Sequence, residues 1–497
     1  MDPLIVLPAE IVLRILEYTP ISGVSSLTRL NKSWHEFIEH LHQDAIYASS
    51  SKTDHPPGAK HFAFLDRIES FDRYFEGTRS WRDLCKRQTL LERNYHRPQP
   101  DVTENLLIPL SEQKRVWRFR TDLNRRFFIC TSQDGGLQVT DVDRGGQLWQ
   151  LPHDDVPPFA HLEYSDGMAV WSTLGDALEV WKADDSGLAR GVFRKVAVLD
   201  CPMHHLRGFH LAYQTLCVVG DDGHGLVYDM KPEPPRLRLR LDIQEGAVGH
   251  LCQAEDVVMY SMGTDGFHIH DKTSGTLLGT IDPGQVSKKY HIIHPTWPAL
   301  DVTGISRKSL QPLPSHEVIS EEKPDLFNPI EVQEGPLPPP TTDEAERTSI
   351  EDDTWGAGLL DGNLMVGISQ AGRVVVCPNW REAIKNDKNF KTHTSIIECE
   401  DNEENFVLGG WLSIRNNRIL FEILDKVYLV SLNEDGTVAT ADQPGRRPSW
   451  CFFSALNLVM QRALQSGISM MALFDDCVMT TIGVCLEILL ELSIDEC

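Results

Sequence analysis

Apolar residues near the N-terminus recur three and four positions apart, the spacing of one face of an α-helix. The first such segment begins at Pro8, which suits the first turn of a helix, and Pro20 ends it. Two further segments follow within the next twenty or so residues, so the pattern predicts a small domain of three short amphipathic helices. The apolar positions are Leu7, Ile11, Ile15 and Leu16 in the first segment, Val24, Leu27 and Leu30 in the second, and Trp34, Phe37, Ile38 and Leu41 in the third.

Residues 7–34 resemble the F-box, the segment by which substrate receptors dock onto the Skp adaptor of cullin-type ubiquitin ligases. The resemblance is carried by Leu7-Pro8-x-Glu10-Ile11, by Ile15-Leu16 and by Trp34. The chain departs from the family in having Leu-Asn-Lys-Ser before this tryptophan, where Val-Cys-Lys or Val-Ser-Lys is usual. The resemblance implies an F-box at 1–50 that binds the adaptor through Leu7, Pro8, Ile11, Ile15 and Leu16, around a core of Leu27, Leu30, Trp34 and Phe37. An ordinary three-helix cap is the alternative reading.

Residues 51–100 are predicted to form a helical connector. Ser80 can cap a helix in which Trp81, Leu84 and Leu91 share one face, and Pro98 breaks it. The segment resembles the connector between an F-box and a following WD-type propeller, with Tyr95 where the family usually has tryptophan.

From about residue 116 the pattern changes to short alternating runs separated by turns. Aspartate or glycine turns precede most of these runs, and a turn of this kind between two apolar runs predicts a β-hairpin. Most of the hairpins recur every 40 to 55 residues or so, the period of four-stranded propeller blades. The runs after the turns are 137–141, 178–181, 225–229, 267–271, 374–377 and 427–430.

These repeats resemble degenerate WD repeats, with Asp141, Asp229 and Asp271 or Trp181 at the closing position, and none has the full Gly-His and Trp-Asp signature. The resemblance implies an all-β propeller of six or seven four-stranded blades at 101–450, so the fold class expected for the chain is multidomain α+β. Residues 451–497 are expected to supply strands of the last blade and an irregular C-terminal segment, with 484–492 helical. Propellers usually close by pairing strands from near both chain termini.

Two successive repeats are separated by about twice the usual distance, and the excess contains an acidic, proline-rich segment. Residues 307–353 hold twelve acidic residues against four basic ones. Such a composition buries too little apolar surface to offset ordering entropy, so a disordered insert is predicted at 306–354.

Length, net charge and cysteine content limit the classes of function that the protein can have. A chain of 497 residues is too long for one hydrophobic core, and a net charge of −25 argues against nucleic acid as a partner. Eleven scattered cysteines without a C-x-x-C pair are typical of reduced thiols in an intracellular protein, in the cytoplasm or nucleus. The most apolar window, 467–490, carries Asp475 and Asp476 and is not expected to span a membrane.

No phosphate loop, nucleophile elbow, zinc-protease helix or dinucleotide fingerprint is present in the sequence. We therefore expect a protein without catalytic residues, metal or cofactor. His268-x-His270 is read as strand surface, because two imidazoles without a third ligand seldom hold a metal.

Clustered arginines are candidates for binding an acidic or phosphorylated target peptide. They are Arg118, Arg120, Arg125 and Arg126, and a second set, Arg236, Arg238 and Arg240, is expected to share one face of a strand. Charge that protects an edge strand is the alternative for the second set.

The function implied is that of a substrate-recognition subunit of a Skp–cullin–F-box ubiquitin ligase. Its expected partners are the Skp adaptor, a cullin reached through that adaptor, and a target protein on the propeller. A scaffold or interaction hub that forms no ubiquitin ligase is the alternative.

Overall fold

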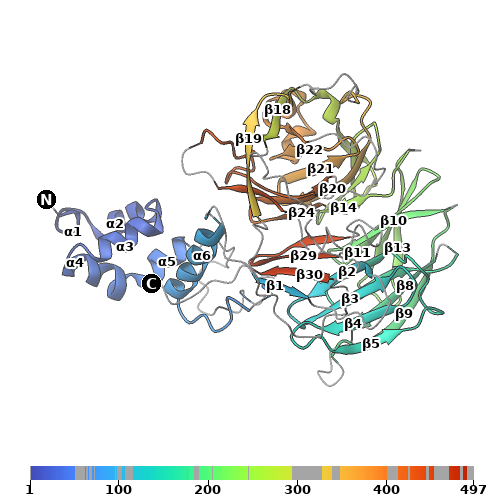
Figure 1. Ribbon diagram of the computed structural model, residues 1–497, viewed down its shortest axis with the longest axis horizontal. Coiled ribbons are helices and arrows are strands. Elements are labelled where there is room, and N and C mark those ends of the chain that lie inside the picture. Colours follow the sequence, from blue (N-terminus) through green and yellow to red (C-terminus); the bar gives the residue numbers. More distant parts are fainter. Residues whose placement is uncertain are drawn as a thin grey trace, which may run out of the picture. The chain divides into compact units, whose positions relative to one another are not determined.

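The computed structural model describes most of the chain and divides it into two compact units (Figure 1). The helical unit comprises Met1–Thr103, Phe474–Cys477 and Leu489–Cys497, and the β unit comprises Glu104–Leu473 and Val478–Ile488. An N-terminal helical region followed by a mostly β region confirms the predicted α+β class. The residues described are 2–50, 62, 65, 70–71, 73–95, 97, 103–106, 116–175, 177–183, 190–203, 205–244, 246–293, 327–338, 348–399, 412–423, 426–443, 447–452, 470–481 and 485–489.

Short helices fill the first fifty residues, and polar side chains fix where two of them begin. Asp2 accepts a hydrogen bond from the backbone N–H of Leu4, and Asn31 accepts one from Trp34. Pro8 and Pro20 occupy the N-cap positions of the second and third helices. The helices are α1 (Pro3–Val6), α2 (Ala9–Glu17), α3 (Ile21–Thr28), α4 (Lys32–His35), the π-helix η1 (Glu36–Leu41) and α5 (Gln43–Ser50).

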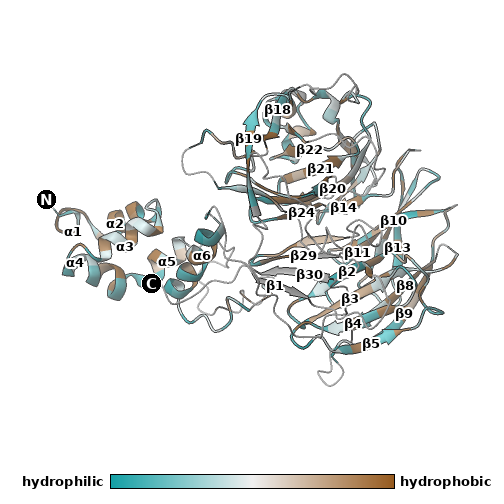
Figure 2. Ribbon diagram, viewed as in Figure 1, coloured by the Kyte–Doolittle hydropathy of each residue, from teal (hydrophilic) through white to brown (hydrophobic). Residues whose placement is uncertain are grey.

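The connector contains one long helix, α6 (Trp81–Tyr95), which contacts α5. The Ser80 hydroxyl accepts a hydrogen bond from Asp83 N–H, and Trp81, Leu84 and Leu91 are buried, so the predicted cap and apolar face are both confirmed. Its remaining surface is hydrophilic, in contrast to strands of the β unit such as β21 and β22 (Figure 2). The predicted helical positions Phe64 and Ile68 lie outside the described residues.

The β unit contains antiparallel four-stranded sheets, most of them formed by strands that follow one another in the chain. Four of them have the orders β2-β3-β4-β5, β6-β7-β8-β9, β10-β11-β12-β13 and β14-β15-β16-β17. Their strands are β2 (Val116–Asp122), β3 (Phe127–Ser132), β4 (Leu137–Asp141), β5 (Gln147–Leu151), β6 (Leu162–Ser165), β7 (Met168–Ser172), β8 (Ala177–Ala183), β9 (Phe193–Asp200), β10 (Leu206–Ala212), β11 (Thr215–Gly220), β12 (His224–Asp229), β13 (Arg236–Asp242), β14 (Leu251–Gln253), β15 (Val257–Ser261), β16 (Phe267–Asp271) and β17 (Leu277–Ile281).

Two further four-stranded groups, β20-β21-β22-β23 and β24-β25-β26-β27, belong to one ten-stranded sheet. The hairpin of β18 and β19 joins them: β18 pairs with β23, and β19 pairs with β27. A short 3-10 helix η3 (Pro283–Gln285) precedes this hairpin, and α7 (Trp380–Ala383) and α8 (Asp387–His393) separate β22 from β23. The strands are β18 (Lys288–Ile293), β19 (Phe327–Glu334), β20 (Trp355–Asp361), β21 (Leu364–Ser369), β22 (Arg373–Cys377), β23 (Ser395–Glu398), β24 (Leu412–Arg415), β25 (Arg418–Ile423), β26 (Lys426–Ser431) and β27 (Ser449–Phe452).

Each run that the sequence placed after a turn is the third strand of its four-stranded group, namely β4, β8, β12, β16, β22 or β26. Asp141, Asp229 and Asp271 end three of these strands, and each carboxylate accepts a hydrogen bond from the backbone N–H two residues later. The aspartates at the closing position therefore build Asx turns. The register shifts between the third and fourth strands at one recurring place, between Val139/Thr140, Val180/Trp181, Val227/Tyr228 and Ile269/His270.

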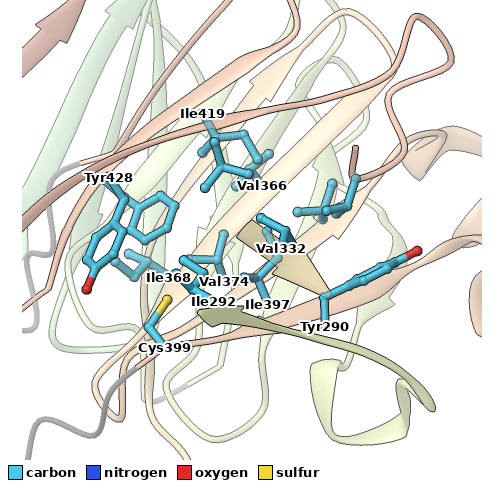
Figure 3. Close-up of a cluster of buried hydrophobic side chains, with 14 of the residues drawn as sticks. Tyr290, Ile292, Val332, Val366, Ile368, Val374, Ile397, Cys399, Ile419 and Tyr428 are labelled. Carbon is cyan, nitrogen blue, oxygen red and sulfur yellow. The ribbon is translucent and has the colours of Figure 1, made fainter. Parts of the chain in front are cut away.

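Hydrophobic cores lie between successive sheets and not within any one of them. In β7, Val170 packs into a core with Phe209 and Val218, whereas its neighbour Trp171 packs into another core with Phe127 and Ile129. Successive side chains of a strand point to opposite faces, so a strand buried on both faces serves two cores. Figure 3 shows the core between β20–β23 and β24–β27, to which Tyr290, Ile292 and Val332 of the β18–β19 hairpin contribute.

The hairpin corrects the prediction of a disordered insert at 306–354. Phe327–Glu334 form the strand β19, which pairs with β18 and β27. Composition was misleading here because Ile330 and Val332 alternate with polar residues and are buried in the shared core. Residues 306–326 and 339–347 lie outside the described part of the chain.

A further sheet combines strands from the two ends of the chain, in the order β1-β30-β29-β28. Its strands are β1 (Thr103–Leu106), β28 (Met471–Leu473), β29 (Cys477–Thr481) and β30 (Cys485–Leu489). The helix predicted at 484–492 is therefore wrong over Cys485–Leu489, where strand pairing overrides a run that reads as helical from local sequence.

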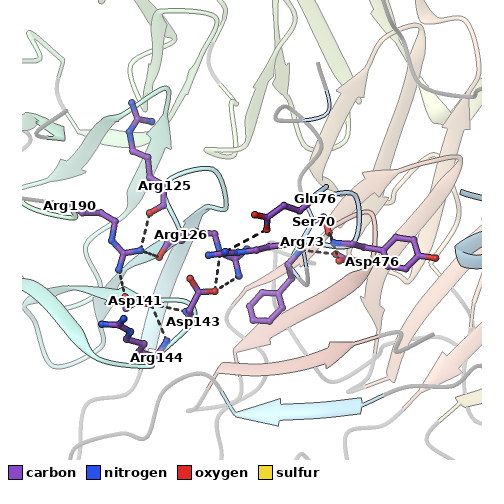
Figure 4. A network of polar contacts seen from close by, with 12 residues as sticks. Ser70, Arg73, Glu76, Arg125, Arg126, Asp141, Asp143, Arg144, Arg190 and Asp476 are labelled. Carbon is purple, nitrogen blue, oxygen red and sulfur yellow. Dashed lines mark hydrogen bonds and ion pairs between the residues drawn. The ribbon is translucent and has the colours of Figure 1, made fainter. Parts of the chain in front are cut away.

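The turn between β28 and β29 belongs to the helical unit. Asp476 accepts hydrogen bonds from the Ser70 hydroxyl at 2.6 Å and from the Phe71 backbone N–H at 2.9 Å (Figure 4). The Tyr95 hydroxyl donates to the Asp475 carbonyl. These bonds satisfy the buried carboxylate of Asp476, as burial of a charged group requires.

First strands of successive sheets contact one another along the β unit. Contacts join β2 to β6, β6 to β10, β10 to β14, β14 to β20, β20 to β24 and β24 to β28. Met470, directly before β28, accepts hydrogen bonds through its sulfur from the Phe119 N–H and the Arg120 guanidinium of β2. The series of contacts that begins at β2 therefore ends beside β2 again, at Met470.

No helix among the described residues is long and apolar enough to cross a membrane. Nine cysteines with described side chains are buried, and none of these nine forms a disulfide bond with another.

A buried ion pair anchors the chain that leads from the β18–β19 hairpin into β20. Arg373 Nη1 lies 2.7 Å from Asp353 Oδ2, with both side chains almost fully buried, and Arg373 also donates to the Thr348 carbonyl. Glu398 faces Arg373 and accepts the Leu337 N–H at 2.8 Å.

Replacement of this arginine by methionine leaves the buried Asp353 carboxylate without its cation and leaves Glu398 with Lys289 alone, 3.7 Å away. We expect Arg373→Met to lower the free energy of unfolding of the β unit by about 3–5 kcal/mol. The matched Arg381→Met, which breaks the exposed pair with Asp256, should cost about 1 kcal/mol or less. Urea unfolding of both variants checks this, and equal losses would contradict it.

Candidate functional site

Helix α2 has apolar residues on two adjacent faces, about 100° apart around its axis. Val12 and Leu16 are buried, at 2% and 1% exposure, and α2 contacts α5. Ile11 and Ile15, one turn apart, are 49% and 50% exposed. Because the buried face already supplies the packing of the helix, the exposed isoleucines are not needed for the core.

Leu7 and Pro8 lie directly before α2 and are also exposed, so four of the five predicted adaptor-binding residues lie on the surface. Sequence reasoning missed α1, whose Ile5 and Val6 extend this exposed apolar surface. The signal for α1 was available in Asp2 and Pro3, which suit an N-cap and the first position of a helix.

Two assignments in the helical region are corrected. Leu16, predicted to face the adaptor, is buried, and Leu30, predicted to lie in the core, is 65% exposed. Leu16 lies one position beyond Ile15, about 100° further around the helix, and so joins Val12 on the buried face. Leu30 follows the end of α3 and is out of phase with it. Leu27 is partly buried, and Trp34 and Phe37 are buried with their rings in edge contact. The buried residues that join them are Val12, Leu16, Val24, Ile38, Ile46 and Tyr47.

The candidate arginines of the first sheet do not form one cluster. Arg125 and Arg126 lie at the β2–β3 turn, where Arg125 pairs with Asp122 at 2.9 Å and Arg126 with Asp143 at 2.6 Å. Figure 4 shows Arg126 within a network that also contains Asp141 and Arg190. These two arginines already hold carboxylates of their own chain.

Asp141 organises this network. Although burial opposes its ionisation, hydrogen bonds from the Asp143 and Arg144 N–H groups and the Arg190 guanidinium lower the pKa of Asp141. The Arg190 guanidinium also donates to the carbonyls of Arg125 and Arg126. The network therefore stabilises the β2–β3 turn and leaves little basic charge for a ligand.

Arg118 and Arg120 lie on β2 beside polar residues of the next two sheets. Arg120 Nη2 lies 2.6 Å from Glu163 Oε1, and His161 Nε2 lies 2.9 Å from the same oxygen. The His161 ring stacks on Phe209 with centroids 4.3 Å apart. Sequence reasoning missed His161 and Glu163, although their alternation directly before and within β6 was a usable signal.

Burial and neighbouring charges determine the protonation of Glu163, His161 and His210. Burial alone would raise the pKa of Glu163, but the Arg120 guanidinium and the His161 hydrogen bond hold it well below its usual range. Burial lowers the pKa of His161 and also that of His210, so both imidazoles are neutral near pH 7. Arg120 thus neutralises an internal carboxylate.

The second basic set does not share one face. The register shift between β12 and β13 falls between Leu237 and Leu239, so Arg236 and Arg240 point to opposite faces of β13. All three of Arg236, Arg238 and Arg240 are exposed on the edge strand of their sheet. This arrangement fits protection of an edge by charge.

No group of three or more histidine, cysteine, aspartate or glutamate residues in the described ranges could hold a metal ion. His268 and His270 are buried and not on a strand surface as predicted.

The neutral histidines predict how stability depends on pH. A histidine whose folded-state pKa lies below its unfolded value binds fewer protons when folded, so its contribution to stability is lost as the pH falls below about 6.5. We expect the melting temperature of the protein to fall between pH 7 and pH 5. The fall should be smaller in His161→Gln/His210→Gln. Calorimetry at both pH values measures it, with exposed His153→Gln as the control that keeps the full fall. An unchanged fall in the double variant would contradict the assignment.

Comparisons with known proteins add little to this geometry. No family model matches the chain, and no curated protein matches it. One solved structure similar to it is the computationally designed Ika8 protein, at 12% sequence identity and a TM-score of 0.44. The match covers 77% of this chain and 99% of that one. A likeness of this size carries no argument about function.

Proposed function

We propose that this protein is the substrate-recognition subunit of a Skp–cullin–F-box ubiquitin ligase. The helical region would dock onto the Skp adaptor, and the β unit would hold a target protein for ubiquitin transfer by a conjugating enzyme. The receptor needs no catalytic residue in this role, because tethering alone raises the effective concentration of the target. The protein would act inside the cell.

The observation that carries the docking role is the second apolar face of α2. Leu7, Ile11 and Ile15 are exposed on a region whose own core is complete without them. Exposed apolar residues that lie side by side mark protein-interaction surfaces more often than scattered ones do. They also coincide with the residues through which the F-box resemblance implies adaptor binding.

For the β unit we propose a propeller of seven four-stranded blades. Five four-stranded sheets and the two four-stranded groups of the ten-stranded sheet would be the blades. Three features support this: the contacts between successive first strands, the hydrogen bonds that link Met470 to β2, and the sheet that combines β1 with β28–β30. Closure by strands from both ends of the chain would leave no open edge between first and last blades.

The docking role can be tested by co-expression with a Skp adaptor. We expect a stable complex with the natural sequence and a loss of affinity of at least about 100-fold in Leu7→Ala/Ile11→Ala/Ile15→Ala, since each truncation at a binding hot spot costs about 1 kcal/mol or more. The variant should keep its melting temperature, because all three side chains are exposed.

The matched control is Leu237→Ala/Leu277→Ala/Leu278→Ala, which truncates three leucines of the β unit that are 44–46% exposed. It should bind the adaptor as the natural sequence does. Undiminished binding by the α2 variant would refute this docking surface. A folded chain that captures neither the adaptor nor a cullin would favour the scaffold alternative.

A further inference from the structure

The fourth strand of the third sheet, β13, has one open edge. It pairs with β12 on one side, and no described strand pairs with its other side. Arg236, Leu237, Arg238 and Arg240 are exposed along it. Backbone N–H and C=O groups on an unpaired edge are available to a further strand, so β13 can accept one.

Fourth strands elsewhere in this chain already accept an additional strand. In the ten-stranded sheet, β23 and β27 are fourth in their groups, as β13 is in its own. β18 pairs with the outer edge of β23, and β19 pairs with the outer edge of β27. The ladder of a fourth strand can therefore be continued by a segment from outside its group, which is the geometry of β-strand addition.

The arginines of β13 have no acidic partner in the described part of the chain. Arg238 donates to the Thr273 hydroxyl at 3.2 Å. Neither this arginine nor Arg236 or Arg240 forms an ion pair with a described carboxylate. On a chain with a net charge of −25, these three guanidinium groups form a local basic surface. Their planar donor groups suit the carboxylates of another molecule.

Other fourth strands show that unpaired cations are unusual at this position. On β9, Arg194 pairs with Glu233 at 3.0 Å, and Lys195 pairs with Glu179. The sequences of β5 and β17 contain no charged residue. Among the fourth strands of the first four sheets, β13 alone therefore carries cations that described carboxylates do not neutralise.

The positive charges lie on both faces of β13 and do not converge on one point. Arg236 lies opposite Asp229 of β12. Arg240 lies opposite Leu226, three positions away on β12, and so on the other face. Along a strand, the two arginines are about 13 Å apart. This spacing does not suit a single phosphate group, whereas an extended peptide presents side chains on both faces.

The same charges disfavour a second copy of this chain on the edge. Two β13 strands side by side would bring their arginines together, and like charges on paired strands are destabilising. Charge that protects this edge from its own kind therefore leaves it open to a strand of opposite charge.

We propose that β13 is the docking edge for an extended acidic segment of a target protein, which adds to the sheet as a fifth strand. One carboxylate of the segment pairs with Arg236 on one face, and another pairs with Arg240 on the other face. An apolar side chain beside the second carboxylate covers Leu237, which is 45% exposed. This inference rests on the proposed function and deepens it, because it names the class of target segment.

The test measures binding of short labelled peptides to the full chain by fluorescence anisotropy. The first peptide contains Glu-Val-Val-Glu between serine and threonine residues, so that its two glutamates lie on opposite faces of a strand. Three others replace both glutamates by glutamine, by lysine or by phosphoserine. We expect the glutamate peptide to bind about tenfold more tightly than the glutamine peptide, since two ion pairs are lost in the latter. The lysine peptide should bind more weakly still.

Methylation of the peptide backbone separates strand addition from charge attraction alone. Alternate N–H groups of an added strand donate to its neighbour, and the intervening ones point away from it. An N-methyl group at one of the first positions should weaken binding by about tenfold or more, because it removes a hydrogen bond and prevents close approach. An N-methyl group at an intervening position should leave binding unchanged. Equal effects at both kinds of position would overturn the proposal.

Reversal of charge on the protein tests the role of the arginines. In Arg236→Glu/Arg240→Glu, the lysine peptide should bind more tightly than the glutamate peptide. The melting temperature should be unchanged, because both side chains are exposed. If this variant does not fold, Arg236→Gln/Arg240→Gln replaces it and should bind the glutamate and glutamine peptides equally. The control, Arg194→Gln on β9, should bind all peptides as the natural sequence does.

An unchanged preference in the folded β13 variants would overturn the proposal, as would binding of the phosphoserine peptide alone. Binding of no peptide would overturn it too, and is the result expected if a second copy or another segment of the same chain occupies the edge. Because no adaptor is present in the assay, its outcome is independent of whether the helical region binds Skp.

Discussion

The β unit depends on one constraint: a four-stranded antiparallel sheet with two apolar faces cannot be stable in water alone. β3, β11 and β21 are buried along their whole length, so each needs a neighbouring sheet on both sides. The alternation of side chains satisfies this need. In β11, Leu216 and Val218 face the core shared with the preceding sheet, while Cys217 and Val219 face the core shared with the following one. No sheet in this succession has a hydrophobic core of its own, so the stability of each sheet depends on the sheets next to it.

The same constraint explains what could be predicted from the sequence. The third strands were found because a turn with aspartate or glycine precedes them, and such turns are local. Gly266 illustrates the requirement: its φ is +74°, and a Cβ there would lie 2.3 Å from the Ile281 carbonyl oxygen. β19 and β30 were missed because their partners, β18, β27 and β29, are what make them strands. Local sequence does not show which distant strands will pair with a segment.

The candidate site residues were also predicted correctly only where local sequence determines their position. Helical spacing identified Ile11 and Ile15 as neighbours, but spacing alone does not say which of two adjacent apolar residues faces inward, and Leu16 was assigned to the wrong side. The arginines near residue 120 were read as a cluster because they are close in sequence. The structure separates Arg118 and Arg120 from Arg125 and Arg126, and carboxylates as distant in sequence as Glu163 neutralise them. A count of charges cannot show which carboxylate reaches which guanidinium.

The exposed apolar residues of α2 and the exposed Phe159 differ in what their backbone conformation costs. The isoleucines of α2 cost the helix little, because both are compatible with helical geometry and the adjacent face, with Val12 and Leu16, supplies the packing. Phe159 requires a left-handed backbone, which costs an L-residue about 1–2 kcal/mol compared with glycine. The surrounding structure can absorb such a cost, since Thr131 donates to the Ala160 carbonyl and Ser132 accepts from the Phe159 N–H. Phe159 is therefore held by the hydrogen bonds of neighbouring backbone and side-chain groups in a conformation that its own side chain disfavours.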